Sequence, residues 1–389
     1  MPEIKAPFYG HARQYHSIKQ ELDSAISTVL ESGSYVQGPA LKQFETDLAK
    51  YFGAKYACGL NSGTDALWLV FMGLGVKPGD EIITTANTFF ATAEAIWIAG
   101  GTAVLVDCDP KTRNIDPKAV EKAITKKTVG IVPVHLYGLS ADMKAISAIA
   151  KKKKLWVVED NAQSIDGHGP GWKQGQLSDA VATSFIIQKN LGTFGDGGAV
   201  VTNREDLDAY CRKMRNHGST VRSVHSFGFN SRLDDIHAAV LSVKLRHITR
   251  WTDRRREIAA RYTKGLQGTS FTLPTEPEGY RHVFHLYVIE HPKRDQLEKD
   301  MIAAGVDVKL HYPIAIHQQK GFPWKKKAVV KKVTNCERNA AQCLSLPMFP
   351  ELTDQEVDYT IEQLVAWDKA NGASKPEAAG KKQLAASKK

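Results

Sequence analysis

Six short apolar segments recur at wide intervals in the first half of the chain, and their spacing constrains the fold more than any other feature. They cover residues 56–60, 81–85, 102–106, 130–134, 156–159 and 182–185. Each has the length of a buried strand, and the stretches between them leave room for helices, expected at 64–74, 92–99, 117–124 and 142–152. This alternation predicts an α/β fold in which helices cover a mainly parallel sheet.

The elements that flank this sheet can also be predicted. A further strand at 198–202 follows the sixth too closely for a crossover helix, so an antiparallel connection is expected there. Ahead of the sheet, Ser17 and Gln20 form a capping-box pattern that predicts a helix from Ser17 to Gly33. Pro39, which a helix tolerates in its first turn, predicts the start of a second helix.

Beyond about residue 245 the strand pattern gives way to a mixed segment with helix candidates at 247–265, 294–305 and 353–369. We therefore predict four parts: an N-terminal arm (1–16), a large α/β domain (17–245), a smaller C-terminal α+β domain (246–369) and a tail (370–389). The tail has almost no large apolar residues, so it is expected to be disordered and basic.

Composition excludes several classes of protein. With 389 residues, 42% hydrophobic and 24% charged, the chain reads as a compact enzyme rather than a fibrous or disordered protein. Membrane-spanning and secretory patterns are missing, so we expect a cytoplasmic protein without a membrane partner. The five cysteines are scattered, which argues against a disulfide framework or a metal site. The net charge of +10 lies partly in the tail, and its basic runs lack interleaved aromatics, so nucleic acid is not the expected partner.

Ligands of parallel sheets gather at the carboxyl ends of the strands, and two such positions predict binding of a flat phosphorylated molecule. The first strand is followed by the turn 61–65, whose amides and hydroxyls could hold a phosphate as the next helix begins. An ordinary helix N-cap is the alternative. Phe89, shortly after the second strand, could stack on a flat heterocycle or pack in the core.

Two further strand ends carry charged residues. Asp160 and Gln163 follow the fifth strand, where a carboxylate needs a cation such as a protonated pyridine nitrogen, unless it forms a helix cap or salt bridge. Lys189 lies between the sixth strand and the glycine-rich stretch 195–199. Burial there would lower the pKa of its amine and favour a Schiff base, although the glycines could simply form a hairpin turn. Together the four positions are what pyridoxal 5′-phosphate requires.

At these positions the chain resembles the DegT/StrS sugar aminotransferases of the aspartate aminotransferase fold. The resemblance extends from about residue 17 to 367, and its most specific motifs are 61–67, 159–163, 184–192, 195–199 and 229–234. It implies a seven-stranded mixed sheet and a homodimer with shared active sites. It also implies that Lys189 forms the Schiff base, Asp160 pairs with the pyridine nitrogen, Gln163 reaches the phenolic oxygen and Phe89 stacks on the ring. The phosphate would be bound by Gly63, Thr64 and Ser184, and by Asn230 of the second subunit.

The resemblance further implies a nucleotide-linked keto sugar as amino acceptor and L-glutamate or glutamine as donor. With glutamine at position 163 the chain resembles the family members that act on a 3-keto sugar. Two segments, 215–218 and 311–313 with His317, resemble those that line the family's substrate cleft, and their candidate residues are Arg215, His217, His311, Tyr312 and His317. A nucleotide diphosphate would need positive donors, and the candidates for these are Arg215, Arg232, Lys309 and His311. Surface or packing roles remain open for the histidines. The alternatives are a cyclitol aminotransferase, a sugar dehydratase, which would carry histidine in place of Lys189, and a non-catalytic regulator.

Overall fold

The computed structural model describes residues 3–221, 223–320 and 328–371. At the N-terminal end, α1 (His11–Ser17) is followed by α2 (Lys19–Ser32) and α3 (Pro39–Phe52). The prediction that a helix starts at Ser17 is wrong, because Ser17 ends α1 and its hydroxyl donates to the carbonyl of Gln14. The expected stop at Gly33 and start at Pro39 are confirmed, and Gly33 adopts the left-handed conformation with φ 66° that glycine allows.

The central sheet is mainly parallel, which confirms the predicted α/β class. Its strand order is β1-β9-β8-β5-β4-β2-β3-β11, and only β9 runs antiparallel, to both β1 and β8. The strands are β1 (Tyr56–Leu60), β2 (Glu81–Thr85), β3 (Thr102–Val106), β4 (Thr128–Val132), β5 (Trp156–Asp160), β8 (Ala180–Ser184), β9 (Gly198–Thr202) and β11 (Ala328–Val330). The sheet has one strand more than the expected seven, because the C-terminal part of the chain adds β11 beside β3.

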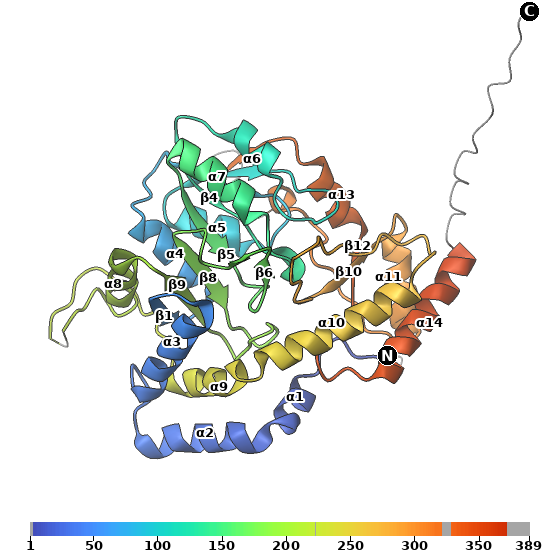
Figure 1. The fold of residues 1–389 in the computed structure, drawn as a ribbon, viewed down its shortest axis with the longest axis horizontal. Coiled ribbons are helices and arrows are strands. Elements are labelled where there is room, and N and C mark those ends of the chain that lie inside the picture. Colours follow the sequence, from blue (N-terminus) through green and yellow to red (C-terminus); the bar gives the residue numbers. More distant parts are fainter. Residues whose placement is uncertain (1–2, 222, 321–327, 372–389) are drawn as a thin grey trace, which may run out of the picture.

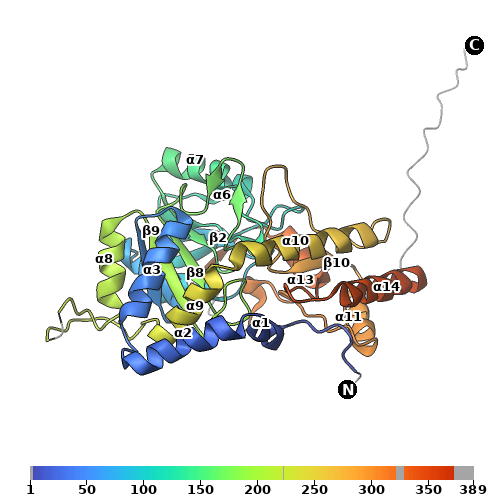
Figure 2. The same cartoon turned by 60° about the horizontal axis from the view of Figure 1, so that its bottom comes forward.

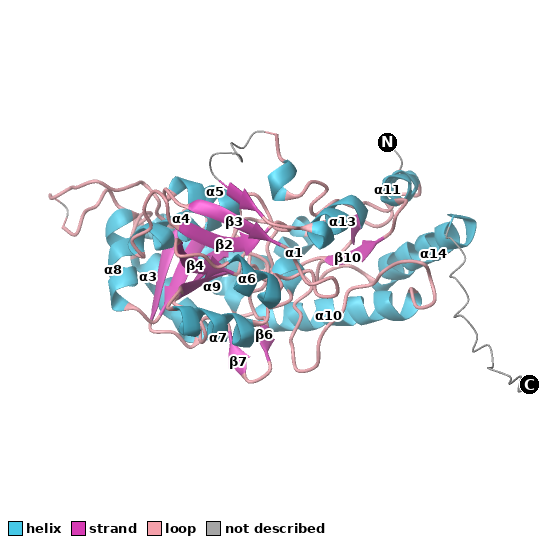
Figure 3. Ribbon diagram, turned by 90° about the horizontal axis from the view of Figure 1, so that it is seen from above, coloured by secondary structure: helices cyan, strands magenta, loops and turns pink. Residues whose placement is uncertain are grey.

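Helices cover both faces of this sheet (Figure 3). In β3, Ala103 and Leu105 face the cluster with α4 (Gly63–Gly73), α5 (Ala91–Ile98) and α8 (Glu205–Met214). Val104 and Val106 point the opposite way, toward α6 (Pro117–Ala123) and α7 (Met143–Lys153). Helices α2, α3 and α9 (Asp235–Leu245) pack together beside the β1 end of the sheet. The strands are buried on both sides, as expected from their unbroken apolar runs.

The C-terminal part has its own core, formed around Tyr262 and Tyr287. Its elements are α10 (Ile248–Gly265), β10 (Tyr287–Glu290), α11 (Arg294–Ala303), α13 (Thr334–Gln342), β12 (Cys343–Leu346) and α14 (Asp354–Asn371). Helix α10 runs beside α14, at the end of the molecule opposite α8 (Figures 1 and 2). The N-terminal segment joins this part, because Lys5 donates its N–H to the carbonyl of Gly305.

Smaller elements complete the described chain: the hairpin β6 (His168–Gly169) and β7 (Trp172–Lys173), and the 3₁₀ turns Leu136–Gly138 and Ile316–Gln318. Of the tail predicted over 370–389, residues 372–389 lie outside the described residues. Among the described helices, none combines the length and the apolar character needed to cross a membrane.

Candidate active site

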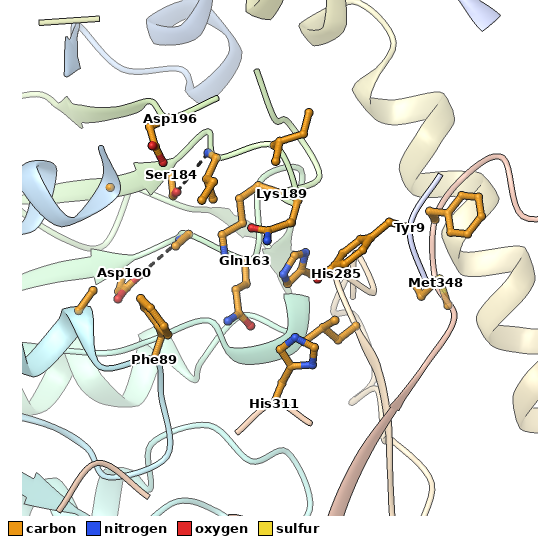
Figure 4. A pocket seen from close by; sticks show the side chains of 18 of the residues that line it. Tyr9, Phe89, Asp160, Gln163, Ser184, Lys189, Asp196, His285, His311 and Met348 are labelled. Carbon is orange, nitrogen blue, oxygen red and sulfur yellow. Dashed lines mark hydrogen bonds between the residues drawn. The ribbon is translucent and has the colours of Figure 1, made fainter. Parts of the chain in front are cut away.

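A cavity of about 430 Å³ lies between the carboxyl edge of the sheet and the C-terminal part of the chain. Asp160 ends β5 and Ser184 ends β8, so both side chains emerge at the same edge. His285 and His311 line the cavity from the C-terminal part (Figure 4). The cavity therefore lies where a parallel sheet is expected to bind its ligand.

Asp160 is a buried carboxylate at the end of β5. One oxygen accepts the hydroxyl of Thr92 at 2.8 Å, and the other accepts the N–H of Ala162 at 3.2 Å. No described residue forms an ion pair with it, and burial raises its pKa, an effect that these hydrogen bonds and nearby Lys189 oppose. A cation at this point would lower the free energy of the charged form, so the carboxylate fits a protonated ring nitrogen.

Lys189 follows β8 in a turn, where its N–H donates to the carbonyl of Ile186 at 2.8 Å. Its side chain lines the cavity (Figure 4), and none of the described residues makes a hydrogen bond to its amine. Burial lowers the pKa of this amine to about 8, against the opposing effect of Asp160. More of the amine is therefore unprotonated near neutral pH than in an ordinary lysine, as a nucleophile that forms a Schiff base requires.

The first turn of α4 lines one end of the cavity. Ser62 caps the helix by accepting the N–H of Asp65, and Gly63 and Thr64 line the cavity. Gly63 lies so close to β8 that an added Cβ would be 2.6 Å from the Cβ of Ser184. Only a glycine allows the helix N-terminus and the end of β8 to approach each other in this way, and the helix N-terminus favours an anion there.

Phe89 and Gln163 provide surfaces for a flat ring. Phe89 is 56% exposed, although it is a large apolar residue, and its ring lies 5.6 Å from that of Tyr312. The Gln163 amide is held in one orientation, because its oxygen accepts the N–H of Tyr137 at 2.7 Å and its nitrogen donates to the Tyr312 hydroxyl at 3.0 Å. The residues of this cavity fit pyridoxal 5′-phosphate at four points: phosphate, ring face, ring nitrogen and aldehyde.

The cavity brings together nine of the candidate residues: Gly63, Thr64, Phe89, Asp160, Gln163, Ser184, Lys189, His311 and Tyr312. The other six do not line it. Asn230 and His217 are exposed at the two ends of a loop that projects beyond α8 (Figure 1). Arg232 donates to Asn216, Lys309 pairs with Asp307, and His317 pairs with Glu337.

Arg215 lies in the core rather than at the cavity of its own chain. Its guanidinium pairs with Glu45 and donates to the carbonyl of Gly59 at 2.8 Å. Arg212 pairs with the second oxygen of Glu45 at 2.7 Å, so the network joins α8 to α3 and β1. This position assigns Arg215 to packing between α3, β1 and α8.

We expect Arg215→Ala to lower the free energy of unfolding by about 3 kcal/mol, because Glu45 would lose one partner of a buried ion pair. Urea unfolding of the purified protein measures this. Arg212→Ala is the matched control and should cost clearly less, since the Arg212 side chain is 37% exposed and Glu45 would keep Arg215. Equal losses in the two variants would contradict the assignment.

Several residues of the cavity were not predicted from the sequence. Thr92, which binds Asp160, and His285 both line the cavity. The N-terminal arm adds Tyr9 and His11, and α10 adds Arg255. Thr92 had one detectable signal, its position one helical turn after Thr88, to which it is hydrogen-bonded at 3.1 Å. The others come from segments remote in sequence and carry no local pattern.

Comparisons with known proteins agree with this geometry. The model of the DegT/DnrJ/EryC1/StrS aminotransferase family matches residues 16–365. A "pleiotropic regulatory protein" of Geobacillus stearothermophilus is 43% identical, over 93% of this chain and 98% of that one. The UDP-N-acetyl-3-dehydro-α-D-glucosamine 3-aminotransferase of Acidithiobacillus ferrooxidans is 40% identical, over 90% and 95%. The crystal structure of DesV from Streptomyces venezuelae is 39% identical with a TM-score of 0.91, covering 95% of this chain and 99% of DesV.

These matches cover most of both proteins, so they confirm the predicted family, fold and cofactor. The chain belongs to the DegT/DnrJ/EryC1/StrS aminotransferase family, and it is an aminotransferase whose cofactor is pyridoxal 5′-phosphate.

Proposed function

We propose that this enzyme transfers an amino group from L-glutamate to the keto carbon of a nucleotide-linked 3-keto sugar. The observation that carries this proposal is the pair Lys189 and Asp160, which a single cavity holds with opposite shifts of pKa. Aminotransfer needs a neutral amine and, in the same site, a buried carboxylate that gains from pairing with a protonated ring nitrogen. The 3-keto position is supported by Gln163 and by the name of the Acidithiobacillus relative.

Each residue of the cavity has a role in this proposal. The first turn of α4 and Ser184 would hold the phosphate, and Phe89 would stack on the ring. Asp160 would keep the ring nitrogen protonated, and Gln163 would donate to the phenolic oxygen. When bound, the cofactor supplies an electron sink for the bond that breaks at the amino-bearing carbon. The amine of Lys189 would remove the proton from that carbon of the donor and return one to the acceptor.

The carboxylates of the donor need a cation in the cavity, and Arg255 is the residue that we propose for this role. It is buried in the cavity wall and forms no ion pair with any described residue. Burial lowers the pKa of its guanidinium to about 10, which leaves it charged at neutral pH. The carboxylate of Glu351 partly opposes this shift without pairing directly with the guanidinium, and a buried cation of this kind favours an anionic ligand.

The pKa of Lys189 predicts how the rate at which the apoprotein attaches its cofactor depends on pH. Only the neutral amine attacks an aldehyde, so the rate constant should rise with pH up to about pH 8 and level off above it. Mixing apoprotein with pyridoxal 5′-phosphate and recording the absorbance change measures this rate. With Nα-acetyl-lysine as reference, the rise should continue to about pH 10.5. A protein profile that follows the reference would contradict the lowered pKa.

We further propose a homodimer in which Asn230 of one subunit reaches the cofactor phosphate of the other. Asn230 is exposed and does not line the cavity of its own chain. The same loop exposes apolar side chains, with Val221 and Val224 each 56% and Phe227 76% exposed. Exposed apolar residues of this kind are typical of a protein interface. Light scattering should give twice the chain mass of 42.9 kDa.

The remaining features of the proposal concern organisation and location. We infer an N-terminal arm, a large domain and a small domain as predicted, with the cavity between the two domains. All five cysteines are buried free thiols, which supports work in the reducing cytoplasm.

The test is turnover by the purified holoenzyme with defined substrates. L-glutamate and L-glutamine serve as donors, and a UDP-linked 3-keto sugar, a dTDP-linked 4-keto sugar and a keto-inositol serve as acceptors. Mass spectrometry detects the amino product. We expect product from L-glutamate and the 3-keto sugar. Product from the keto-inositol alone would replace this proposal by cyclitol transamination.

A regulatory role is the second candidate, because the Geobacillus relative carries a regulatory name. The intact Lys189 and Asp160 pair argues for catalysis, since a regulator without chemistry has no need for a buried, partly neutral lysine. Gel-shift titrations with duplex DNA at two salt concentrations would reveal a regulator as salt-dependent binding.

A further inference from the structure

His285 lies in the cavity wall near Lys189, just before β10. The residue is 8% exposed and lines the cavity, and Figure 4 shows its imidazole between Lys189 and Tyr9. The roles proposed above for the cofactor, the donor and the transferred proton leave this imidazole unused. Its hydrogen bonds show what it can offer to a ligand.

Asn190, the residue after Lys189, determines which nitrogen of His285 carries the proton. The amide nitrogen of Asn190 donates to the carbonyl of Val283 at 3.3 Å, so its oxygen is the atom that faces His285. This oxygen lies 3.0 Å from Nδ1 of His285 and can only accept a hydrogen bond. The proton of a neutral imidazole is therefore on Nδ1, and Nε2 has a free lone pair.

The surroundings keep this imidazole neutral. Burial holds the pKa of His285 well below its ordinary value, and the cations of Lys189 and Arg255 lower it further. No described residue donates a hydrogen bond to Nε2. With Nδ1 turned to Asn190, Nε2 is the polar atom that His285 can present to a ligand in the cavity.

We propose that Nε2 of His285 accepts a hydrogen bond from a hydroxyl group of the amino-acceptor sugar and so selects for the sugar half of the reaction. This inference rests on the proposed function. A sugar offers hydroxyl donors, whereas the carboxylates of glutamate are acceptors and would face an unprotonated nitrogen without a hydrogen bond. Through Nε2 of His285 the cavity would thereby distinguish the sugar from glutamate.

The first test reads the proton position directly. Histidine ¹⁵N spectra of the holoenzyme, with the His285 signals assigned from their loss in His285→Phe, should show a protonated Nδ1 and a bare Nε2 between pH 6 and 8. Asn190→Asp keeps an acceptor oxygen beside Nδ1 and should leave the proton on Nδ1. Asn190→Leu removes that acceptor and should change the position of the proton. A protonated Nε2, or a charged ring, in the unmodified protein would overturn the inference.

The second test separates the two half-reactions. L-glutamate probes the donor half, and a UDP-linked 3-amino sugar, reacting in reverse, probes the sugar half. His285→Phe should slow the sugar half about 10-fold, as expected for the loss of one buried hydrogen bond, and change the donor half less than about 3-fold. His285→Gln, which restores an acceptor oxygen, should recover part of the loss.

Equal losses in both halves, or no recovery with glutamine, would overturn the role of His285. An unmodified holoenzyme that reacts with L-glutamate but not with the amino sugar would overturn the proposed sugar substrate instead. In that case the ¹⁵N spectra still decide whether Nε2 is an acceptor.

Discussion

Replacing Lys189 by alanine is expected to lower turnover at least about 10⁴-fold, because in the proposed function its amine provides both the covalent anchor and the acid–base group. The variant should also fail to develop the yellow absorption that unmodified protein shows with pyridoxal 5′-phosphate and loses on addition of L-glutamate. Absorbance spectra and a product assay measure the two effects.

Lys244 offers a matched control, because its pKa is also lowered to about 8 by burial. It does not line the cavity, and its amine donates to the carbonyl of Gly192 at 2.7 Å. Lys244→Met should therefore still attach the cofactor. If Lys189→Ala kept its turnover while Lys244→Met lost it, the assignment of the catalytic lysine would be wrong.

Replacing Asp160 by asparagine is expected to lower turnover about 10³-fold, comparable with the removal of a strong electrostatic contact in other active sites. Asparagine has nearly the same shape and can still accept the hydroxyl of Thr92, but it cannot keep a ring nitrogen protonated. A turnover assay with saturating cofactor measures this loss, and a decrease of less than about 10-fold would contradict the role of Asp160.

The same substitution should not destabilise the apoprotein. The pKa of Asp160 is raised by burial, so its charged form opposes folding at neutral pH. This cost decreases as the pH falls below the raised pKa and is gone below the ordinary pKa of 3.8. Urea unfolding of apo Asp160→Asn should therefore match or exceed that of the unmodified apoprotein. The neighbouring Glu159→Gln is the control with the opposite expectation. Its carboxylate faces away from the cavity and accepts from Gly175 and Ser178, so this variant should lose stability and keep its cofactor spectrum.

Local patterns in the sequence were sufficient for most of the sheet and for the cofactor end of the cavity. The predicted strands agree with the structure within about two residues at each end. Asp160 and the turn before α4 could be found because they lie at the carboxyl ends of strands, and the strand order brings those ends to one edge. Ser184, the last residue of β8, was named only through the family resemblance. The capping pattern at Ser17 failed because it was read from two residues, while α1 had already started upstream at His11.

The substrate end of the cavity could not be predicted in the same way. Arg215 carries the charge expected of a substrate-binding residue, but its location depends on Glu45, which is 170 residues away in the chain. His285 gives no signal until Asn190, 95 residues earlier, is placed beside it. The strand β11 is only three residues long, and its pairing with β3 arises from the way the C-terminal part packs.

The sequence by itself determined the α/β class and the cofactor, and it singled out Lys189 as the candidate to bind that cofactor. These follow from apolar periodicity and from residue types next to strand ends, which are properties of short stretches of chain. The tertiary structure alone decided which charges face the cavity, which are neutralised in the core, and which nitrogen of His285 is free. Each of these depends on partners far apart in the chain, because burial and hydrogen bonding are set by what packs around a group and not by its neighbours in sequence.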